Sequence, residues 1–344
     1  ISQNELCLGT DGKGTKIFNI PKQLITDYPF DNNYLDSGTS KVHSVLKDNA
    51  GNLWIAIYQK GVMMIPAQPN SFKYIGYKSI NKNIIGSNCI TSLCRDHKGI
   101  LWIGTDNDGI YGITTELKQK VHYAPHDSPS SVPSTVFGLY EDSEHNLWFG
   151  SYTNGLGRLD KKTGQCSYLQ NLTDKNGNRI QRVYDLVEDQ DKRLWIATMG
   201  AGLFYYDLKT GQSVYDPKFN AATKKYKWIS CLLYAGDNHL YVGTYDGIRC
   251  IDLSTDDFKT EEILSRHIIH SLYEDPQGNI WIGNSEGLAE WNPQTQQLKT
   301  YTTAHGLSSN AVYAIKGDGQ DNLWISTNAG MSRFNLNTHT FSNF

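Results

Sequence analysis

One short pattern recurs along this chain and restricts what it can fold into. Aligned on the aromatic residue of L-W-I-G-T, the pattern occurs eight times in 344 residues. The copies read LCLGT at Cys7, LWIAI at Trp54, LWIGT at Trp102, LWFGS at Trp148, LWIAT at Trp195, LYVGT at Tyr241, IWIGN at Trp281 and LWIST at Trp324. Successive copies are 47, 48, 46, 47, 46, 40 and 43 residues apart. This period indicates a repeat architecture, in which each unit buries its apolar face against its neighbours.

Each copy sits within the same order of short segments. An apolar segment comes first, as in IIHSLYED (268–275), and the L-W-I-G-T segment follows after a turn. A third segment starts at a glycine, as in GLGRLD (155–160), and a more polar fourth closes the unit, as in QQLKTY (296–301). Four short strands graded from apolar to polar are typical of a propeller blade, whose inner strands are buried on both faces. We therefore predict an all-β protein with the β-propeller fold.

The strand count leaves two arrangements open. Residues 41–344 contain seven complete four-stranded units, whereas residues 1–40 contain only strands two to four of a further unit. We predict that residues 41–344 form a seven-bladed β-propeller and that residues 1–40 end a preceding propeller. The alternative is an eight-bladed ring in which residues 1–40 supply part of the eighth blade.

Three positions of the repeat have a predicted structural role. A small residue lies two positions after the aromatic, where neighbouring blades should leave no room for a larger one: Gly9, Ala56, Gly104, Gly150, Ala197, Gly243, Gly283 and Ser326. A glycine six or seven residues after the aromatic should supply the positive φ of a hairpin: Gly14, Gly61, Gly109, Gly155, Gly202, Gly247, Gly287 and Gly330. The aromatic itself should be core, wedged between adjacent blades.

An aspartate stands six residues before the aromatic in six of the seven copies that have residues there. These are Asp48, Asp96, Asp142, Asp189, Asp275 and Asp318. A recurring carboxylate can hold metal ions, but an aspartate in a turn more often caps backbone N–H groups. We expect turn caps, no metal site and no cofactor.

The stretches YEDPQGNIWIGNSEGLAEW (273–291) and CRDHKGILWIGTDNDGIYGI (94–113) share the pattern E-D-x-x-G-N-L-W-I-G-T-x-x-G-L. This pattern resembles the two-component regulator propeller repeat over essentially the whole chain. The resemblance implies the periplasmic sensor region of a hybrid two-component system, an inner-membrane histidine kinase of Gram-negative gut bacteria that regulates glycan utilisation. It also implies the partners: a small carbohydrate ligand, a neighbouring propeller, an immunoglobulin-like domain and, in the full-length sensor, a second copy in a homodimer.

Propellers hold ligands at one end of the central channel, on loops that packing leaves free. We expect the hairpins between second and third strands to share this end with the connections between blades. The hairpin candidates are Tyr58, Asp106, Asn107, Tyr152, Asn154, Tyr245, Asp246, Glu286 and Asn328, and the connections add His126, Arg179, Arg182 and His305. Aromatic rings with amides and carboxylates suit a sugar, so we predict non-catalytic recognition of an oligosaccharide.

Other functions are less well supported by the sequence. The formal net charge of −3, without a clustered basic run, argues against nucleic acid. No nucleophile motif such as G-x-S-x-G occurs. His267 and His270 are three residues apart on an expected strand, so they should point to opposite faces and make a poor metal pair. The alternatives are a propeller enzyme acting on carbohydrate, either a lyase or a hydrolase, and a protein-interaction scaffold.

Overall fold

The computed structural model describes residues 4–28, 39–67, 75, 85–87, 89–114, 120–174, 176–215, 220, 228–255 and 258–344. Its named elements are thirty β-strands and one 3-10 helix, Thr303–His305. The protein is an all-β propeller, as predicted. The chain divides into two compact units, Ile1–Asn88 and Cys89–Phe344.

The unit Cys89–Phe344 contains six four-stranded antiparallel blades. The first blade consists of β7 (Ile90–Arg95), β8 (Leu101–Thr105), β9 (Ile110–Ile113) and β10 (Lys120–Tyr123). The second consists of β11 (Val136–Glu141), β12 (Leu147–Ser151), β13 (Leu156–Leu159) and β14 (Cys166–Tyr168). The third consists of β15 (Val183–Glu188), β16 (Arg193–Thr198), β17 (Leu203–Asp207) and β18 (Gln212–Val214). The fourth blade consists of β19 (Ile229–Ala235), β20 (His239–Thr244), β21 (Gly247–Asp252) and β22 (Thr260–Ser265). The fifth consists of β23 (Ile269–Glu274), β24 (Ile280–Asn284), β25 (Gly287–Asn292) and β26 (Gln297–Tyr301). The sixth consists of β27 (Val312–Gly317), β28 (Asn322–Thr327), β29 (Gly330–Asn335) and β30 (Thr340–Asn343).

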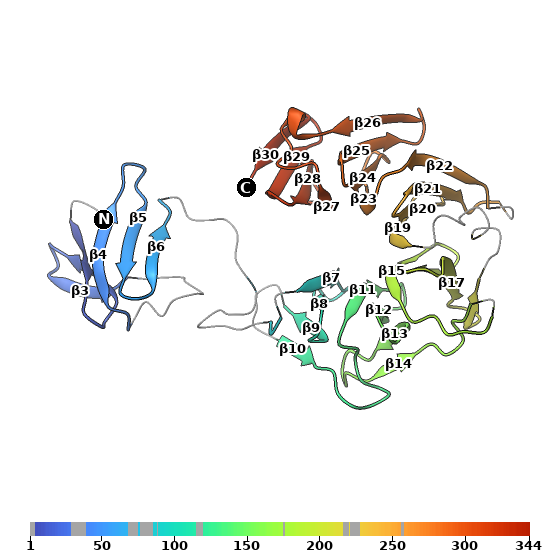
Figure 1. Ribbon diagram of the computed structural model, residues 1–344, viewed down its shortest axis with the longest axis horizontal. Coiled ribbons are helices and arrows are strands. Elements are labelled where there is room, and N and C mark those ends of the chain that lie inside the picture. The colour runs from blue at the N-terminus through green and yellow to red at the C-terminus, as the bar shows by residue number, and fades with distance from the viewer. Residues whose placement is uncertain are drawn as a thin grey trace. The chain divides into compact units, whose positions relative to one another are not determined.

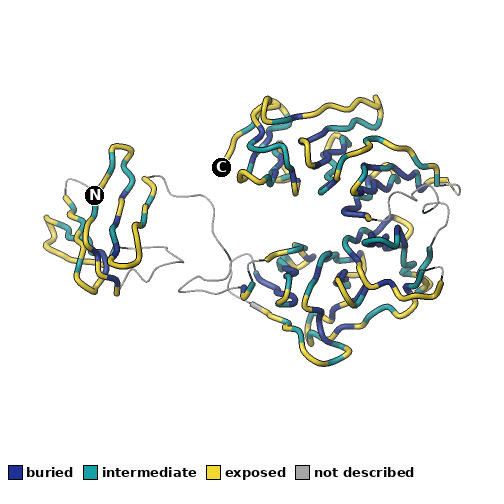
Figure 2. The backbone as a smooth tube through the Cα atoms, viewed as in Figure 1, coloured by how far each residue is buried: buried dark blue, intermediate teal, exposed yellow. Residues whose placement is uncertain are grey.

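These six blades follow one another in an arc. Each first strand packs beside the first strand of the next blade, in the order β7, β11, β15, β19, β23 and β27. Figure 1 shows these first strands towards the inside of the arc, with β10, β14, β22 and β26 towards the outside. Burial does not follow this order. It is greatest in second strands such as β12, whose residues are all buried, whereas the first strands β7 and β27 are largely exposed or half-buried (Figure 2).

The unit Ile1–Asn88 contains two three-stranded sheets. The first consists of β1 (Glu5–Gly9), β2 (Thr15–Asn19) and β3 (Leu24–Asp27), and the second of β4 (Val42–Lys47), β5 (Leu53–Ile57) and β6 (Gly61–Ile65). A fourth strand of the second sheet would fall largely outside the described residues. A Cβ on Gly9 would lie 2.7 Å from Val42 Cγ1, so the two sheets approach each other as adjacent blades do. The number of blades in a ring, and the place of residues 1–40, stay predictions.

The repeated small residue is needed because the next blade touches it. A Cβ on Gly150 would lie 2.5 Å from the carbonyl oxygen of Val183, the first residue of β15. Gly283 makes the same approach to Val312, at 2.7 Å from its Cγ1. The hairpin glycines are confirmed as well, since all eight have positive φ, from 68° at Gly14 to 158° at Gly287.

The repeated aromatic residue fills the space between two blades. Trp195, which has no exposed surface, packs on Ile229 and Leu232 of the next blade. The same arrangement recurs where Trp281 packs on Val312. For Trp54, whose side chain is 40% exposed, the core position stays a prediction, because the blade that would cover it does not belong to its unit. It lies on the last blade of its unit, so no further blade of that unit covers it.

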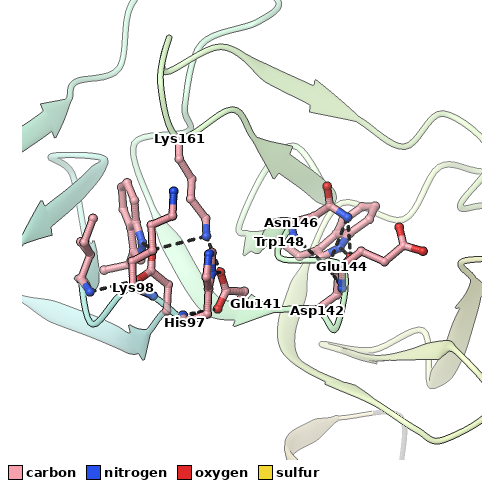
Figure 3. Close-up of polar contacts among 11 residues, drawn as sticks. His97, Lys98, Glu141, Asp142, Glu144, Asn146, Trp148 and Lys161 are labelled. Carbon is pink, nitrogen blue, oxygen red and sulfur yellow. Dashed lines mark hydrogen bonds and ion pairs between the residues drawn. The ribbon is translucent and has the colours of Figure 1, made fainter.

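The repeated aspartate joins the turn to the tryptophan. Asp142 Oδ1 accepts the backbone N–H of Asn146 at 2.7 Å, which is the predicted cap, and Asp142 Oδ2 accepts Trp148 Nε1–H at 2.7 Å (Figure 3). The same Asp-to-Trp bond occurs in four other copies, at 2.8–2.9 Å: Asp48 with Trp54, Asp96 with Trp102, Asp189 with Trp195 and Asp275 with Trp281. One carboxylate therefore satisfies the turn and orients the interblade ring.

The glutamate before this aspartate bonds to the preceding blade. Glu188 Oε2 accepts the backbone N–H of Ser143 at 2.6 Å, and Glu274 accepts that of Gly236 at 3.2 Å. Where the preceding turn has Pro276, which lacks an N–H, the corresponding residue is Gly317 rather than an acid. The two acids of the E-D pair thus have separate structural roles. The aspartate caps its own turn, and the glutamate accepts a backbone N–H from the turn of the preceding blade.

Candidate functional site

Both predicted loop sets lie at the same end of the blades. The backbone N–H of the first hairpin residue donates to a carbonyl just before the first strand of the same blade. Tyr152 donates to Thr135 at 3.4 Å, and Tyr245 donates to Trp228 at 3.3 Å. These bonds hold the hairpins beside the connections, which places the candidate residues from both loop sets at one end.

Among the predicted residues, Tyr152 contacts both an aromatic ring and a guanidinium group. Its ring is 42% exposed and meets Phe137 edge to face, with 5.8 Å between centroids. The guanidinium of Arg182, from the connection into the next blade, lies 4.9 Å from the ring centroid. This distance is in the range of a cation–π contact. Phe137 in turn stacks on Tyr184 of the next blade at 5.1 Å.

Phe137 and Tyr184 were missed by the sequence analysis, and both lie at β-bulges. The register of each first strand shifts at one residue, which is Phe137 in β11 and Tyr184 in β15. Bulges re-aim side chains and are common next to functional sites. The signal was present in the sequence, because the second residue of VFGLYED, VYDLVED and VYAIKGD is aromatic each time.

A second aromatic pair lies one blade beyond Tyr184, on the β19–β22 blade. Tyr245 is 49% exposed and Trp228 is 46% exposed, and their rings meet edge to face at 5.9 Å. Tyr184 lies on β15, which packs beside β19, the strand that follows Trp228. Burial, followed by the charge of Tyr245, raises the pKa of the Tyr184 phenol. We call Phe137, Tyr152, Tyr184, Trp228 and Tyr245 the aromatic group; it spans three consecutive blades.

The remaining predicted residues near Tyr152 make mainly structural bonds. Asp106 accepts the Thr135 hydroxyl at 2.7 Å. Arg179 donates to the backbone carbonyl of Asn154 at 3.1 Å, which ties a connection to a hairpin. Asn107 is exposed and adopts a left-handed φ of 78°, a turn conformation that asparagine tolerates well.

The other predicted residues lie on separate blades. Glu286 Oε2 contacts His267 Nε2 at 3.1 Å, and the backbone carbonyl of Asp246 accepts the N–H of Arg266 at 2.9 Å. The Nδ1 atom of His305 accepts the backbone N–H of Thr302 at 3.1 Å. Asn328 and His126 are exposed. Tyr58 belongs to the unit Ile1–Asn88, where it stacks on His43 at 5.0 Å.

The expectation for His267 and His270 is partly wrong. His267 precedes β23 rather than lying on a strand, because β23 begins at Ile269. The two histidines nevertheless contact different partners. His267 meets Glu286, whereas the His270 ring packs on Tyr313 at 5.1 Å.

The residue after Tyr184 carries a carboxyl group whose pKa is raised. Asp185 follows Tyr184, and its carboxylate accepts backbone N–H groups from Leu232 of the next blade at 2.8 Å and from Leu186 at 2.9 Å. Burial raises the pKa of Asp185 to about 6, and the two hydrogen bonds only partly oppose this.

We expect Asp185→Ser to change how stability depends on pH. An unfolded aspartate has a pKa of about 3.9, so the unfolded chain releases the Asp185 proton at a lower pH than the folded protein does. The free energy of unfolding of the wild type therefore falls as the pH rises towards 6. Serine already stands at the aligned Ser92 and Ser271. Urea unfolding should show the wild type losing on the order of 2 kcal/mol relative to the variant between pH 4.5 and 7.5. An unchanged difference would contradict this.

A cavity of about 610 Å³ lies at the other end of two blades. Its lining includes the turn after β7, with His97 and Lys98, and the turn after β11, with His145. These turns follow first strands, whereas the predicted hairpins follow second strands, so the cavity is separate from the aromatic group. The sequence analysis placed no candidate residue there.

The comparisons with known proteins agree with this architecture. A model of the two component regulator propeller matches five segments: 84–107, 130–153, 174–200, 263–286 and 306–329. These five segments are similar to the repeat of that family. A sequence search of curated proteins finds no match. Among the described residues, no helix has the length and apolar character needed to cross a membrane.

Solved structures share the fold of this repeat protein. The extracellular domain of a hybrid two-component system from B. thetaiotaomicron matches with a TM-score of 0.63 and 19% identity, over 100% of this chain and 56% of the other. A one-component system domain from the same organism gives 0.66 and 20%, over 100% and 48%. A streptogramin B lyase gives 0.55 and 15%, over 74% and 82%. The chain thus spans about half the length of the first two.

Proposed function

We propose that this chain is part of the extracytoplasmic sensor of a hybrid two-component system and that it recognises an oligosaccharide without turning it over. The five matched repeat segments support the first half of the proposal, as does the fold shared with extracellular domains of such systems. In this proposal the chain lies in the periplasm as part of an inner-membrane histidine kinase that regulates glycan use. A second propeller, an immunoglobulin-like domain and a second copy of the protein are its proposed partners.

The aromatic group carries the second half of the proposal. Tyr152, Trp228 and Tyr245 are each between 42% and 49% exposed, although aromatic residues ordinarily bury most of their surface. Neither tyrosine is required by its turn, since Asp106 and Ser285 stand at the equivalent hairpin positions. Flat rings offer a sugar large contact area at low entropic cost, because each has only two χ angles. Their faces suit the C–H surface of a pyranose, and nearby polar groups such as Arg182 suit its hydroxyls.

Enzymatic turnover is the main rival, because a lyase shares the fold. Among the contacts that the structure describes for the aromatic group there is no nucleophile–base pair, and recognition needs none. The two functions differ in a simple measurement. Incubating the protein with the oligosaccharide that it binds should return the sugar unchanged, whereas release of shortened or unsaturated products would identify an enzyme.

We expect Tyr152→Ala and Tyr245→Ala each to abolish the thermal shift that a binding oligosaccharide produces. The melting temperature without ligand should barely change, because surface substitutions usually alter stability by about 0.5 kcal/mol or less. A screen of glycan fragments on the wild type would first identify the ligand. The matched control is Leu298→Ala, which removes a similarly exposed apolar side chain (39%) from an outer strand, β26. A full ligand response in both tyrosine variants would refute the site.

A further inference from the structure

Two histidines and one glutamate meet across two blades, at the end opposite the aromatic group. We propose that His97, Glu141 and His145 bind a divalent transition-metal ion of the Zn²⁺ class. His97 lies in the turn after β7, Glu141 ends β11, and His145 lies in the turn after β11 (Figure 3 shows His97 and Glu141). This site is independent of the sugar-binding proposal, since the two share no residue.

The ligand atoms are already close to one another. One atom from each of the three side chains lies within 4.8 Å of the other two. His97 Nδ1 is 2.7 Å from Glu141 Oε1, and the two imidazole rings stack with 3.7 Å between centroids. Tetrahedral zinc with bonds of about 2.0–2.1 Å needs ligand atoms about 3.4 Å apart. The His97–Glu141 pair must therefore open slightly and His145 must swing inwards, which its exposed position allows.

The backbone at His145 adopts a left-handed φ of 67°, as the turn requires. Three aligned turns have glycine at this position, namely Gly51, Gly99 and Gly278, and a fourth has Lys192 with φ of 69°. The turn therefore accepts a long side chain here, and His145 can present its imidazole without disturbing the fold.

The donor set fits a transition metal better than Mg²⁺ or Ca²⁺. Two imidazole nitrogens and one carboxylate oxygen are the ligands of catalytic zinc sites, which keep a fourth position open. Mg²⁺ and Ca²⁺ prefer sites made of oxygen. His97 and His145 both line the cavity of about 610 Å³, so the fourth position can be reached from solvent. Glu141 Oε2 also accepts the backbone N–H of His97 at 2.6 Å, which fixes the carboxylate.

One positive charge competes with the metal. The Lys161 ammonium bonds to Glu141 Oε1 and also lies 3.4 Å from Asp96 Oδ2 (Figure 3 shows the first bond). A bound cation must displace Lys161 from Glu141, and Asp96 remains available to hold the displaced ammonium. Removing this ammonium should therefore strengthen metal binding. A purely structural role of the three ligands would not produce that effect.

The test is metal binding by the whole chain after treatment with a chelator. Titration with Zn²⁺ against a chromophoric competitor should show one tight equivalent in the wild type and no comparable binding of Mg²⁺. His145→Gly and His97→Asn should each weaken this binding at least tenfold. Both variants borrow residues from aligned turns, Gly99 and Asn49, so the fold should tolerate them.

Two further variants complete the test. Lys161→Met should tighten Zn²⁺ binding about tenfold, a change of about 1.4 kcal/mol. His239→Asn is the control, because His239 pairs with Asp237 at 3.1 Å but belongs to no three-ligand group among the described residues. This control should bind like the wild type. Absence of a tight equivalent, or unchanged binding in both His145→Gly and His97→Asn, would overturn the proposal.

Discussion

Gly150→Leu should lower the free energy of unfolding by about 3 kcal/mol or more, the upper end of overpacking in a core. The first atom of any side chain there would lie 2.5 Å from the backbone oxygen of Val183 and 2.8 Å from its Cγ1. A backbone oxygen cannot rotate away as a side chain can. The β11–β14 and β15–β18 blades would have to separate, which would expose the core that Trp148 shares with Val183.

Urea unfolding followed by tryptophan fluorescence measures this effect. The control is Thr153→Leu, which places the same leucine side chain in the exposed hairpin of the same blade. Surface changes of this kind usually stay within about 0.5 kcal/mol. Equal denaturation midpoints for the two variants would show that the β12 strand does not pack against the next blade.

Asp142→Ala should have the second-largest effect, a loss of about 3 kcal/mol. Asp142 is 2% exposed and accepts the backbone N–H of Asn146, the backbone N–H of Glu144 and the Nε1–H of Trp148. Alanine would leave these donors without their acceptor, and each unsatisfied buried donor costs about 1–3 kcal/mol. The indole N–H contributes most clearly, because Trp148 is only 3% exposed.

Asp318→Ala is the control for this prediction, because the same repeat position is solvent-exposed there. Asp318 caps its turn through the N–H groups of Gln320 and Asn322, which water can satisfy once the carboxylate is removed. We expect a loss of about 1 kcal/mol or less, typical of an exposed cap. If both variants lose the same free energy of unfolding in urea, the bond from Asp142 to the tryptophan contributes little. The turn cap would then explain the repeated aspartate by itself.

Features of the fold that depend on residues close together in the chain could be predicted from local sequence. Strand order within each blade follows from hairpins, and a hairpin needs only its own turn residues, such as Gly155 with φ of 78°. The recurring small residue likewise predicted close blade packing, because the same restriction applies to every repeat. The placement of both loop sets at one end also followed, since antiparallel strands alternate in direction.

Part of the candidate site could also be predicted from the sequence. Tyr152 and Tyr245 stood out because their hairpins do not require an aromatic residue, and both are exposed in the structure. Whether they bind a sugar stays a prediction. Their neighbours Phe137 and Tyr184 were missed although an aromatic recurs at that place of the first strand, because the bulge that positions them is a property of two paired strands.

Which side chains meet across blades could not be predicted from the sequence and is seen in the folded chain. Trp54 and Trp195 occupy the same repeat position, yet one is 40% exposed and the other is fully buried, because burial depends on whether another blade of the unit follows. His97 and Glu141 are 44 residues apart in sequence and 2.7 Å apart in space. The repeat period brings consecutive blades together, but the pairing of particular side chains depends on rotamers and on the spacing between blades, which local sequence patterns do not specify.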